Sequence, residues 1–141
     1  MGARRKRRGR ALRINKILIV DDDEDIRAVA EIAARRIGNW EVVSAASGEE
    51  ALAIASSERP DVILLDVMMP QLDGLATLAK LREEPTTAGI PVIFLTAKVQ
   101  PHEIEAYRAR GAHGVISKPF DVTTLPDEIR GILRGARPVG P

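Results

Sequence analysis

The chain has 141 residues, a formal net charge of +1, two histidines and no cysteine. This length allows one domain with a substantial core, but not a second domain of ordinary size. The lack of cysteine excludes disulfide frameworks, thiolate nucleophiles and thiolate zinc sites. Because no apolar stretch approaches the roughly 18 residues that a membrane span requires, we expect a cytoplasmic protein without such a span.

The charge is distributed unevenly along the chain. Residues 1–16 contain eight lysines or arginines and no acidic residue, so the remainder holds 13 basic against 20 acidic residues. A basic segment without an apolar face cannot bury enough surface to offset the entropy of ordering, and we expect residues 1–14 to be a disordered leader. Residues 15–135 then form the folded domain and residues 136–141 a short flexible tail. The leader is open to three interpretations: a solvated tail, a wrongly assigned start codon, or a segment that binds nucleic acid or an anionic membrane.

Strand and helix patterns alternate along the chain from Asn15. Short apolar runs predict strands, and apolar residues at helical spacing between them predict helices. Gly38 is a stop signal for the first helix, and Ser47 is a start signal for the second. In chain order the expected elements are strand 17–20, helix 26–37, strand 40–45, helix 51–57, strand 62–65, helix 75–82, strand 91–95, helix 101–110, strand 114–117 and helix 125–133.

The same spacing predicts which side of each helix is buried. The expected buried stripes are Ile26, Val29, Ala30, Ala33 and Ile37 in the first helix, Leu75, Leu78 and Ala79 in the third, and Leu125, Ile129, Ile132 and Leu133 in the last.

Five strands that alternate with five helices predict a mostly parallel sheet. Each connection between parallel strands must cross a face of the sheet, so helices are expected on both faces. Runs of four consecutive apolar residues fit strands that are buried on both sides. Ligands of such sheets bind outside the carboxyl ends of the strands. The chemistry of this chain is therefore expected where the apolar runs end.

Polar side chains follow four of the predicted strands. Asp21 and Asp22 follow the first strand, Asp66 the third, Thr96 the fourth and Lys118 the fifth. Mg²⁺ is held through oxygen ligands, commonly one or two carboxylates together with phosphate, and Asp22 and Asp66 suit that role. A hydroxyl and an ammonium group can contact phosphoryl oxygens. These residues predict a site for Mg²⁺ and a phosphoryl group, with Asp66 as the candidate acceptor.

Each of these residues also has a plain structural interpretation. The acidic run that begins at Asp21 fits the first turn of a helix, Thr96 fits a helix cap, and Lys118 fits a surface lysine. Their joint occurrence at strand ends favours the functional interpretation. Pro119 adds a candidate cis peptide bond, because X-Pro bonds take the cis form at appreciable frequency; a trans turn is the alternative.

Five motifs occur in order along residues 15–135. They are Ile17 to Asp22, Asp66 to Pro70 with Asp73 and Gly74, Leu95 to Ala97, Gly111 with Ala112, and Lys118 to Phe120. Each motif alone is weak, but the ordered set resembles the receiver domain of two-component response regulators, of the single-domain, chemotaxis-regulator-like kind. The resemblance implies an α/β fold, the flavodoxin-like (βα)5 three-layer sandwich with a five-stranded parallel sheet.

The resemblance also implies a phosphoacceptor of a two-component or phosphorelay system. Asp66 would take a phosphoryl group from a histidine kinase or a histidine phosphotransfer protein and form an aspartyl phosphate. Asp22, Asp66 and the backbone carbonyl of Met68 would bind Mg²⁺ directly, with Asp21 acting through water. The protein would then be a switch that gains and loses a phosphoryl group, rather than a multiple-turnover enzyme.

Other roles carried over from the family concern the phosphoryl group and its effects. Thr96 and Lys118 would contact the phosphoryl oxygens, and the small Ala97 would leave room for the donor. The bond before Pro119 is typically cis in this family. Many receivers carry an aromatic residue three positions before the lysine, which swings inward during activation, whereas this chain has Val115. That relay is not available in the same form, so activation is read out in another way or weakly; ordinary strand packing of Val115 is the simpler interpretation.

The expected output is a contact with a downstream protein whose identity is unknown. The segment after Leu133 is too short for a DNA-binding module, so nucleic acid is not an expected partner. The family's usual interaction surface is built from the fourth helix, the fifth strand and the fifth helix, and here it would include Tyr107, Arg108 and Val115. A monomer, or a weak dimer through this surface, is expected.

Four alternatives stay open at this stage. One is a phosphorelay intermediate, and another is an adaptor that binds nucleic acid or a membrane through the basic leader. A third is a Mg²⁺-dependent phosphatase of the haloacid dehalogenase type, but such enzymes carry their nucleophile after the first strand and Asp66 follows the third. The fourth, a degenerate receiver used as a scaffold, is disfavoured because every site residue is present.

Overall fold

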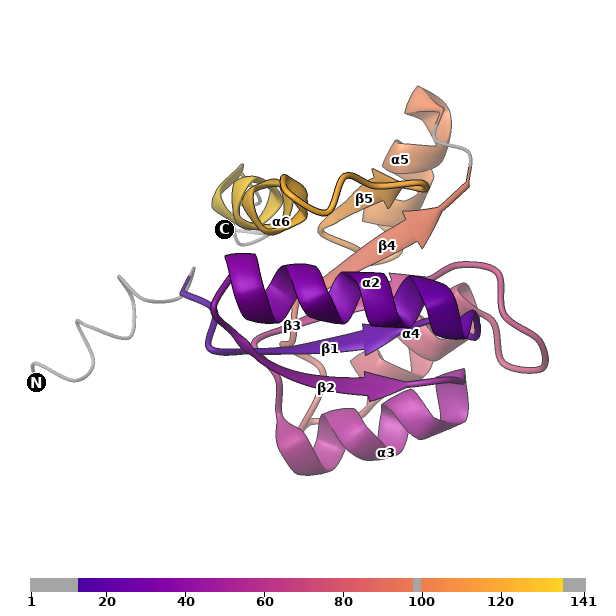
Figure 1. Ribbon diagram of the computed structural model, residues 1–141. Helices are drawn as coiled ribbons and strands as arrows, with labels where there is room; N and C mark the ends of the chain where they lie inside the picture. The colour runs from indigo at the N-terminus through magenta and orange to yellow at the C-terminus, as the bar shows by residue number, and fades with distance from the viewer. Residues whose placement is uncertain (1–12, 98–99, 136–141) are drawn as a thin grey trace, which may run out of the picture.

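The computed structural model describes residues 13–97 and 100–135. In this part of the chain five strands form one parallel sheet in the order β2-β1-β3-β4-β5, and helices cover both faces (Figure 1). The predicted α/β fold class is confirmed. The elements are β1 (Lys16–Val20), α2 (Glu24–Ile32), the π-helix η1 (Ala33–Ile37), β2 (Glu41–Ala45), α3 (Gly48–Glu58), β3 (Val62–Asp66), α4 (Gly74–Glu83), β4 (Val92–Thr96), α5 (Pro101–Ala109), β5 (Gly114–Ser117) and α6 (Leu125–Gly135).

The strands are in register at their carboxyl ends. Val20 of β1 pairs with Leu65 of β3, Leu65 pairs with Phe94 of β4, and Phe94 pairs with Val115 of β5. All five residues of β3 and of β4 are buried, as continuous apolar runs predict for central parallel strands. The residues that follow these strands therefore meet at one edge of the sheet.

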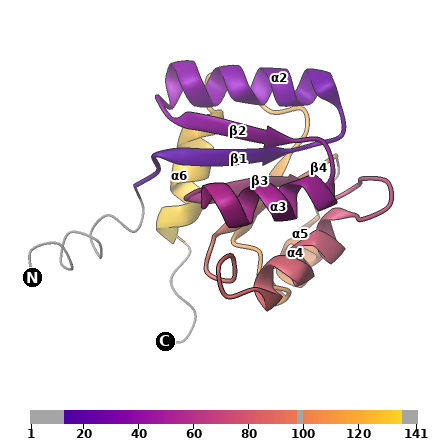
Figure 2. The ribbon, with the colours of Figure 1, turned by 90° about the horizontal axis from the view of Figure 1, so that it is seen from below.

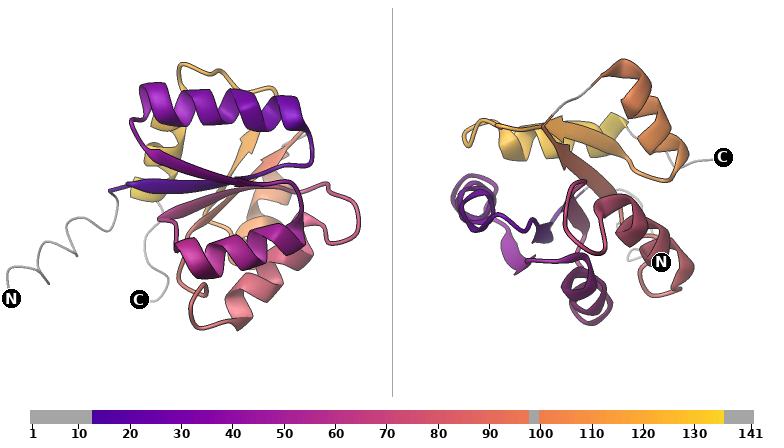
Figure 3. Two further views of the ribbon diagram at one scale, coloured as in Figure 1. Left: turned by 60° about the horizontal axis from the view of Figure 1, so that its bottom comes forward. Right: turned by 90° about the vertical axis from the view of Figure 1, so that its right-hand side faces the viewer.

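Helices on the two faces enclose two separate apolar clusters. Side chains alternate along each strand, so Ile17 and Ile19 of β1 pack with α2, η1 and α6, whereas Leu18 and Val20 pack with α3, α4 and the end of α5. Figure 1 shows α2 above β1 and β2 with α3 below them, and Figure 2 gives the same layers from below. The two further views in Figure 3 show the helices on both sides of the twisted sheet.

The first helix differs from the prediction of a single α-helix. It changes at Ala33 into the π-helix η1, where Gly38 N donates to Ala33 O at 3.0 Å, five residues back. The residues that face the sheet are alanines, while Val29 and Ile37 of the predicted stripe are 38% and 45% exposed. Small side chains let the helix lie close to the sheet, and the wider π turn changes the phase of the helix before Ile37. Ala79 of the third stripe is also exposed, because α4 buries Thr77, Leu78 and Leu81 instead.

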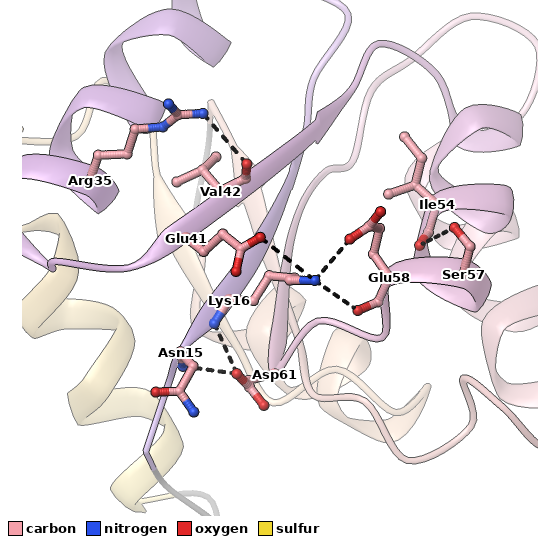
Figure 4. A network of polar contacts seen from close by, with 9 residues as sticks. All are labelled: Asn15, Lys16, Arg35, Glu41, Val42, Ile54, Ser57, Glu58 and Asp61. Atoms are coloured by element: carbon pink, nitrogen blue, oxygen red, sulfur yellow. Dashed lines mark hydrogen bonds and ion pairs between the residues drawn. The ribbon is translucent and has the colours of Figure 1, made fainter.

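The amino edge of the sheet carries a network of polar contacts (Figure 4). Asn15 N and Lys16 N donate to Asp61 Oδ2 at 2.8 and 2.9 Å. Lys16 Nζ forms ion pairs with Glu58 Oε1 at 2.8 Å and with Glu41 Oε2 at 3.9 Å. These contacts tie the start of β1 to β2, to the end of α3 and to the loop before β3. The charges at this edge therefore hold the strands in place.

The ends of the chain bear on the predicted domain limits. Ile14, assigned to the leader, is 7% exposed and belongs to one apolar cluster, so the packed part of the chain includes it. The rest of the predicted leader before Arg13 and the predicted tail over 136–141 lie outside the described residues. Across the ranges 13–97 and 100–135, no helix has the length and apolar character needed to cross a membrane.

Candidate functional site

Asp21 follows β1 directly and is completely buried. Its N–H donates to Ala45 O at 3.2 Å, and its carbonyl oxygen accepts from Arg27 Nη1 at 2.8 Å. Its Oδ1 accepts from Asp23 N at 2.9 Å, and its Oδ2 lies 3.0 Å from Lys118 Nζ. Backbone and side chain are both fixed, so the carboxylate has a defined position at the sheet edge.

Asp66 is the last residue of β3 and is 3% exposed. Its Oδ1 lies 3.1 Å from Lys118 Nζ and accepts from Met68 N at 3.3 Å. The loop after it is closed by Gly74, whose N–H donates to Val67 O at 2.9 Å. A Cβ on Gly74 would collide with the backbone carbonyl oxygen of Asp66, so only glycine allows this approach.

Thr96 and Lys118 reach the same edge from β4 and from the loop after β5. Thr96 is the last residue of β4 and is buried, and its carbonyl oxygen accepts from Lys118 N at 2.8 Å. The Lys118–Pro119 peptide bond is cis. Ala97 is exposed directly after Thr96, and Val115 is half-buried within β5. Lys118 Nζ is thereby held between the carboxylates of Asp21 and Asp66.

Three carboxylates lie close enough together to share a cation. One oxygen each from Asp21, Asp22 and Asp66 falls within 4.8 Å of the others, and Asp22 is exposed, so the group opens to solvent. Asp21 Oδ2 is enclosed and lies 3.0 Å from Lys118 Nζ. An all-oxygen donor set with more carboxylates than cations fits Mg²⁺.

The electrostatics of the cluster follow from burial and from like charge. Burial raises the pKa of Asp66 to about 6, with the nearby Asp21 acting in the same direction and Lys118 and the Met68 N–H opposing it. Burial opposes the charge on Lys118, but the two carboxylates outweigh it and raise the pKa of the ammonium. Lys118 is therefore a permanent cation beside a carboxylate that is ionised at neutral pH.

The comparisons with known proteins agree with this arrangement. A model of the response regulator receiver domain matches residues 17–130. The chain belongs to the response regulator receiver family. The predicted resemblance is thereby confirmed, and receiver domains of this family are phosphoacceptor modules of two-component systems that bind Mg²⁺ at an acidic cluster and interact with histidine kinases.

Three proteins that resemble this chain are named as two transcriptional regulators and one chemotaxis protein. The chain is 44% identical to the probable transcriptional regulator ycf27 of Cyanophora paradoxa over 84% of this chain and 48% of that protein. It is 36% identical to the alkaline phosphatase synthesis transcriptional regulatory protein PhoP of Bacillus subtilis over 89% and 51%. The chemotaxis protein CheY4 of Vibrio cholerae superimposes with a TM-score of 0.78 at 34% identity, covering 84% of this chain and 98% of that one. The chain spans about half the length of the curated relatives it matches.

The receiver brings together most of the residues that sequence motifs singled out. Asp21, Asp22, Asp66 and Lys118 form the cluster, and Thr96 is tied to it through the backbone of Lys118. Val115 lies farther back in β5, where it pairs with Phe94. The side chain of Met68 is 75% exposed at the rim.

Two contributors to the site were not predicted from the sequence. Arg27 holds the carbonyl of Asp21, and Asp23 caps α2 by accepting from Asp25 N and Ile26 N. The acidic run did signal the helix start, whereas nothing in the spacing of Arg27 distinguished it from an ordinary surface residue of α2.

Proposed function

We propose that Asp66 is the phosphoacceptor of a response regulator that works in the cytoplasm. The observation that carries the proposal is a buried carboxylate at the end of a central strand, 3.1 Å from Lys118 Nζ and grouped with two further carboxylates. The donor is a phosphohistidine of a histidine kinase or of a histidine phosphotransfer protein. The phosphoryl group then changes which downstream protein the receiver contacts.

The transfer needs little covalent chemistry from the protein. A carboxylate oxygen of Asp66 forms a bond to phosphorus as the bond between phosphorus and the donor's histidine nitrogen breaks, and the electron pair returns to that nitrogen. Lys118 offsets negative charge on the transferred group, and the hydroxyl of Thr96 donates to one of its oxygens. Ala97 leaves the entrance open for the bulky donor.

Mg²⁺ has a natural set of ligands here. Asp22, Asp66 and the carbonyl of Met68 would hold it directly and Asp21 through water, and the bound ion would neutralise charge on the phosphoryl oxygens. Asp21 and Arg27 keep the ligand-bearing loop in place through the contacts made to the Asp21 backbone. In this proposal the receiver acts as a terminal switch; passing the phosphoryl group on to a second histidine is the alternative. A monomer, or a weak dimer through α5, β5 and α6, suits both roles.

Intact mass spectrometry tests the proposal directly. Incubation with acetyl phosphate and MgCl₂ should add one phosphoryl group to the wild-type chain, and none to Asp66→Asn, because the amide lacks a nucleophilic carboxylate oxygen. Chelation of Mg²⁺ should prevent the addition.

Glu105→Gln is the matched control, since it neutralises an exposed carboxylate on α5 away from the cluster. It should be phosphorylated like the wild type. A phosphoryl adduct that persists in Asp66→Asn, or no adduct in the wild type with any phosphodonor, contradicts the proposal. Repeated turnover of a phosphate monoester would instead favour a phosphatase.

A further inference from the structure

Met68 carries an exposed thioether next to the carboxylate cluster. The residue is 75% exposed, whereas Val67 before it is 7% exposed and Met69 after it is 8% exposed. Both neighbours belong to the apolar cluster that packs against α3 and α4. Because its two neighbours are fixed in the core, Met68 is held with its side chain toward solvent.

The backbone ties Met68 to the candidate acceptor. Its N–H donates to Asp66 Oδ1 at 3.3 Å. The N–H of Val67, which lies between them, donates to Leu95 O at 3.0 Å, and Val67 O accepts from Gly74 N at 2.9 Å. The thioether therefore leaves the backbone at a fixed point on the rim of the site, two residues after Asp66.

The accessible sulfur of the described residues lies at this one position. The sequence contains no cysteine and three methionines, of which Met1 lies outside the described residues. Of the two methionines within 13–97 and 100–135, Met69 is enclosed and Met68 is open to solvent. Oxidants convert the thioether of methionine into a sulfoxide, and the reaction requires access to the sulfur. A mild oxidant should therefore reach Met68 before Met69.

We propose that Met68 is an oxidation site at which a peroxide shortens the lifetime of the phosphoryl group on Asp66. Hydrogen peroxide transfers one oxygen atom to the Met68 sulfur: the O–O bond breaks, a sulfur–oxygen bond forms, the sulfur loses two electrons and the peroxide is reduced to water. Methionine sulfoxide reductases reverse this step. The oxidation does not depend on the proposed function, whereas its effect on the phosphoryl lifetime rests on it.

The effect follows from the change in polarity at the rim. A thioether sulfur is a weak hydrogen-bond acceptor, so Met68 offers little to hold a water beside the phosphoryl group. Oxidation makes this side chain polar, and the sulfoxide oxygen accepts a hydrogen bond from such a water. The water oxygen then forms a bond to phosphorus as the bond from phosphorus to the Asp66 oxygen breaks. The electron pair returns to the carboxylate, and the proton of the water passes to solvent.

Tandem mass spectrometry of a peptide that contains both methionines tests the site. In the folded chain treated with hydrogen peroxide, Met68 should gain an oxygen at least about tenfold faster than Met69, because only the Met68 sulfur is accessible. In guanidinium chloride, where the chain is unfolded, the two rates should become similar. Equal rates in the folded chain, or faster oxidation of Met69, overturn the site.

Decay of the phosphorylated chain tests the effect. The chain is phosphorylated with acetyl phosphate and MgCl₂, the phosphodonor is removed, and loss of the phosphoryl group is followed by intact mass. Oxidation should shorten the lifetime in the wild type about threefold, as one added hydrogen bond to the attacking water allows. Reduction by a methionine sulfoxide reductase with dithiothreitol should restore it. A lifetime that peroxide leaves unchanged overturns the effect.

Two substitutions at Met68 separate the sulfoxide from other peroxide damage. Met68→Leu has no sulfur, so peroxide should not change the lifetime of that variant. Met68→Gln places an amide oxygen at the rim, and its phosphoryl group should be short-lived with or without peroxide. Peroxide-dependent shortening in Met68→Leu overturns the role of Met68. A wild type that gains no phosphoryl group contradicts the proposed function and ends the lifetime part, while the oxidation rates still decide the site.

Discussion

At the scale of single residues, the site holds negative charges that repel one another. Asp66 is placed in a buried position beside Asp21, and Lys118 compensates for only part of the cost of its charge. An ionised carboxylate that lacks full compensation destabilises the folded chain. Because these carboxylates repel one another, the cluster favours the binding of a divalent cation.

The raised pKa of Asp66 predicts how stability depends on pH in the metal-free protein. Its folded-state pKa is about 6 against an ordinary value of 3.8, so the folded state binds this proton more tightly. The stability that this tighter proton binding adds to the folded state is fully present below pH 3.8 and is lost as the pH rises through about 6. In the presence of a chelator, Asp66→Asn should therefore be more stable than the wild type at pH 7.5, by on the order of 2 kcal/mol, with the difference narrowing as the pH falls toward 4.

Urea denaturation of both proteins across this pH range measures the difference. Glu105→Gln, an exposed neutralisation, should track the wild type at every pH. Should Asp66→Asn be less stable than the wild type at pH 7.5, the carboxylate is better compensated than its surroundings indicate.

The position of the site residues at one sheet edge could be predicted because strand ends are visible in the sequence. A continuous apolar run marks a buried parallel strand, and the residue after it must lie at the carboxyl edge. Asp66, Thr96 and Lys118 lie where this pattern predicts. The hydrogen bond from Arg27 to the Asp21 carbonyl could not be predicted from the sequence, because it depends on the direction of a long side chain that leaves α2 toward a loop.

At the scale of elements, the junction between β3 and α4 controls where Asp66 lies. Asp73 caps α4 by accepting from Ala76 N at 2.8 Å, and Gly74 begins the helix against the backbone of Asp66 and Val67. Gly74→Ala should therefore displace the Asp66 backbone. We expect a loss of stability of about 1–3 kcal/mol and slower uptake of a phosphoryl group from acetyl phosphate.

Gly131→Ala in α6 is the matched control for this substitution. A Cβ at Gly131 meets no atom within 4 Å, so the change should be neutral or stabilise the helix by about 0.5–1 kcal/mol. Denaturation midpoints and phosphorylation rates of the two variants separate steric pressure on the site from the general preference of helices for alanine. Equal behaviour of both variants contradicts the role given to Gly74.

The order and type of the elements could be predicted from the sequence, but not which face of every helix is buried. Alternating apolar runs and helical spacing fixed five strands and the helices between them, because each pattern has its own period. The π-helix over Ala33–Ile37 escaped prediction, since one extra residue in a turn depends on packing against β2 and α6 rather than on local preference. The edge-to-face contact between the rings of Phe94 and Tyr107 also escaped prediction, because it joins β4 and α5, whose relative placement is a tertiary property.

At the scale of the whole molecule, the sheet separates a structural edge from a chemical edge. At the amino edge, acidic residues are paired with Lys16 or with backbone N–H groups, as in the contacts of Asp61. At the carboxyl edge, three carboxylates lie together, and Lys118 forms ion pairs with two of them, Asp21 and Asp66. The carboxyl edge therefore carries negative charge that Lys118 does not fully compensate. Binding of a cation at this edge is expected to affect the stability of the whole folded chain.

Binding of Mg²⁺ should stabilise the whole chain, because the unfolded chain does not bring Asp22 and Asp66 together. An ion present at about 100 times its Kd adds about 2.7 kcal/mol, enough to raise the thermal midpoint by several degrees. Differential scanning calorimetry at pH 7.5 with MgCl₂, against NaCl at equal ionic strength, measures the rise. Asp22→Asn, which removes an exposed ligand, should lose most of it, whereas Glu105→Gln should keep it. A rise that NaCl reproduces, or that survives in Asp22→Asn, would mean that ionic screening rather than a shared cation relieves the repulsion.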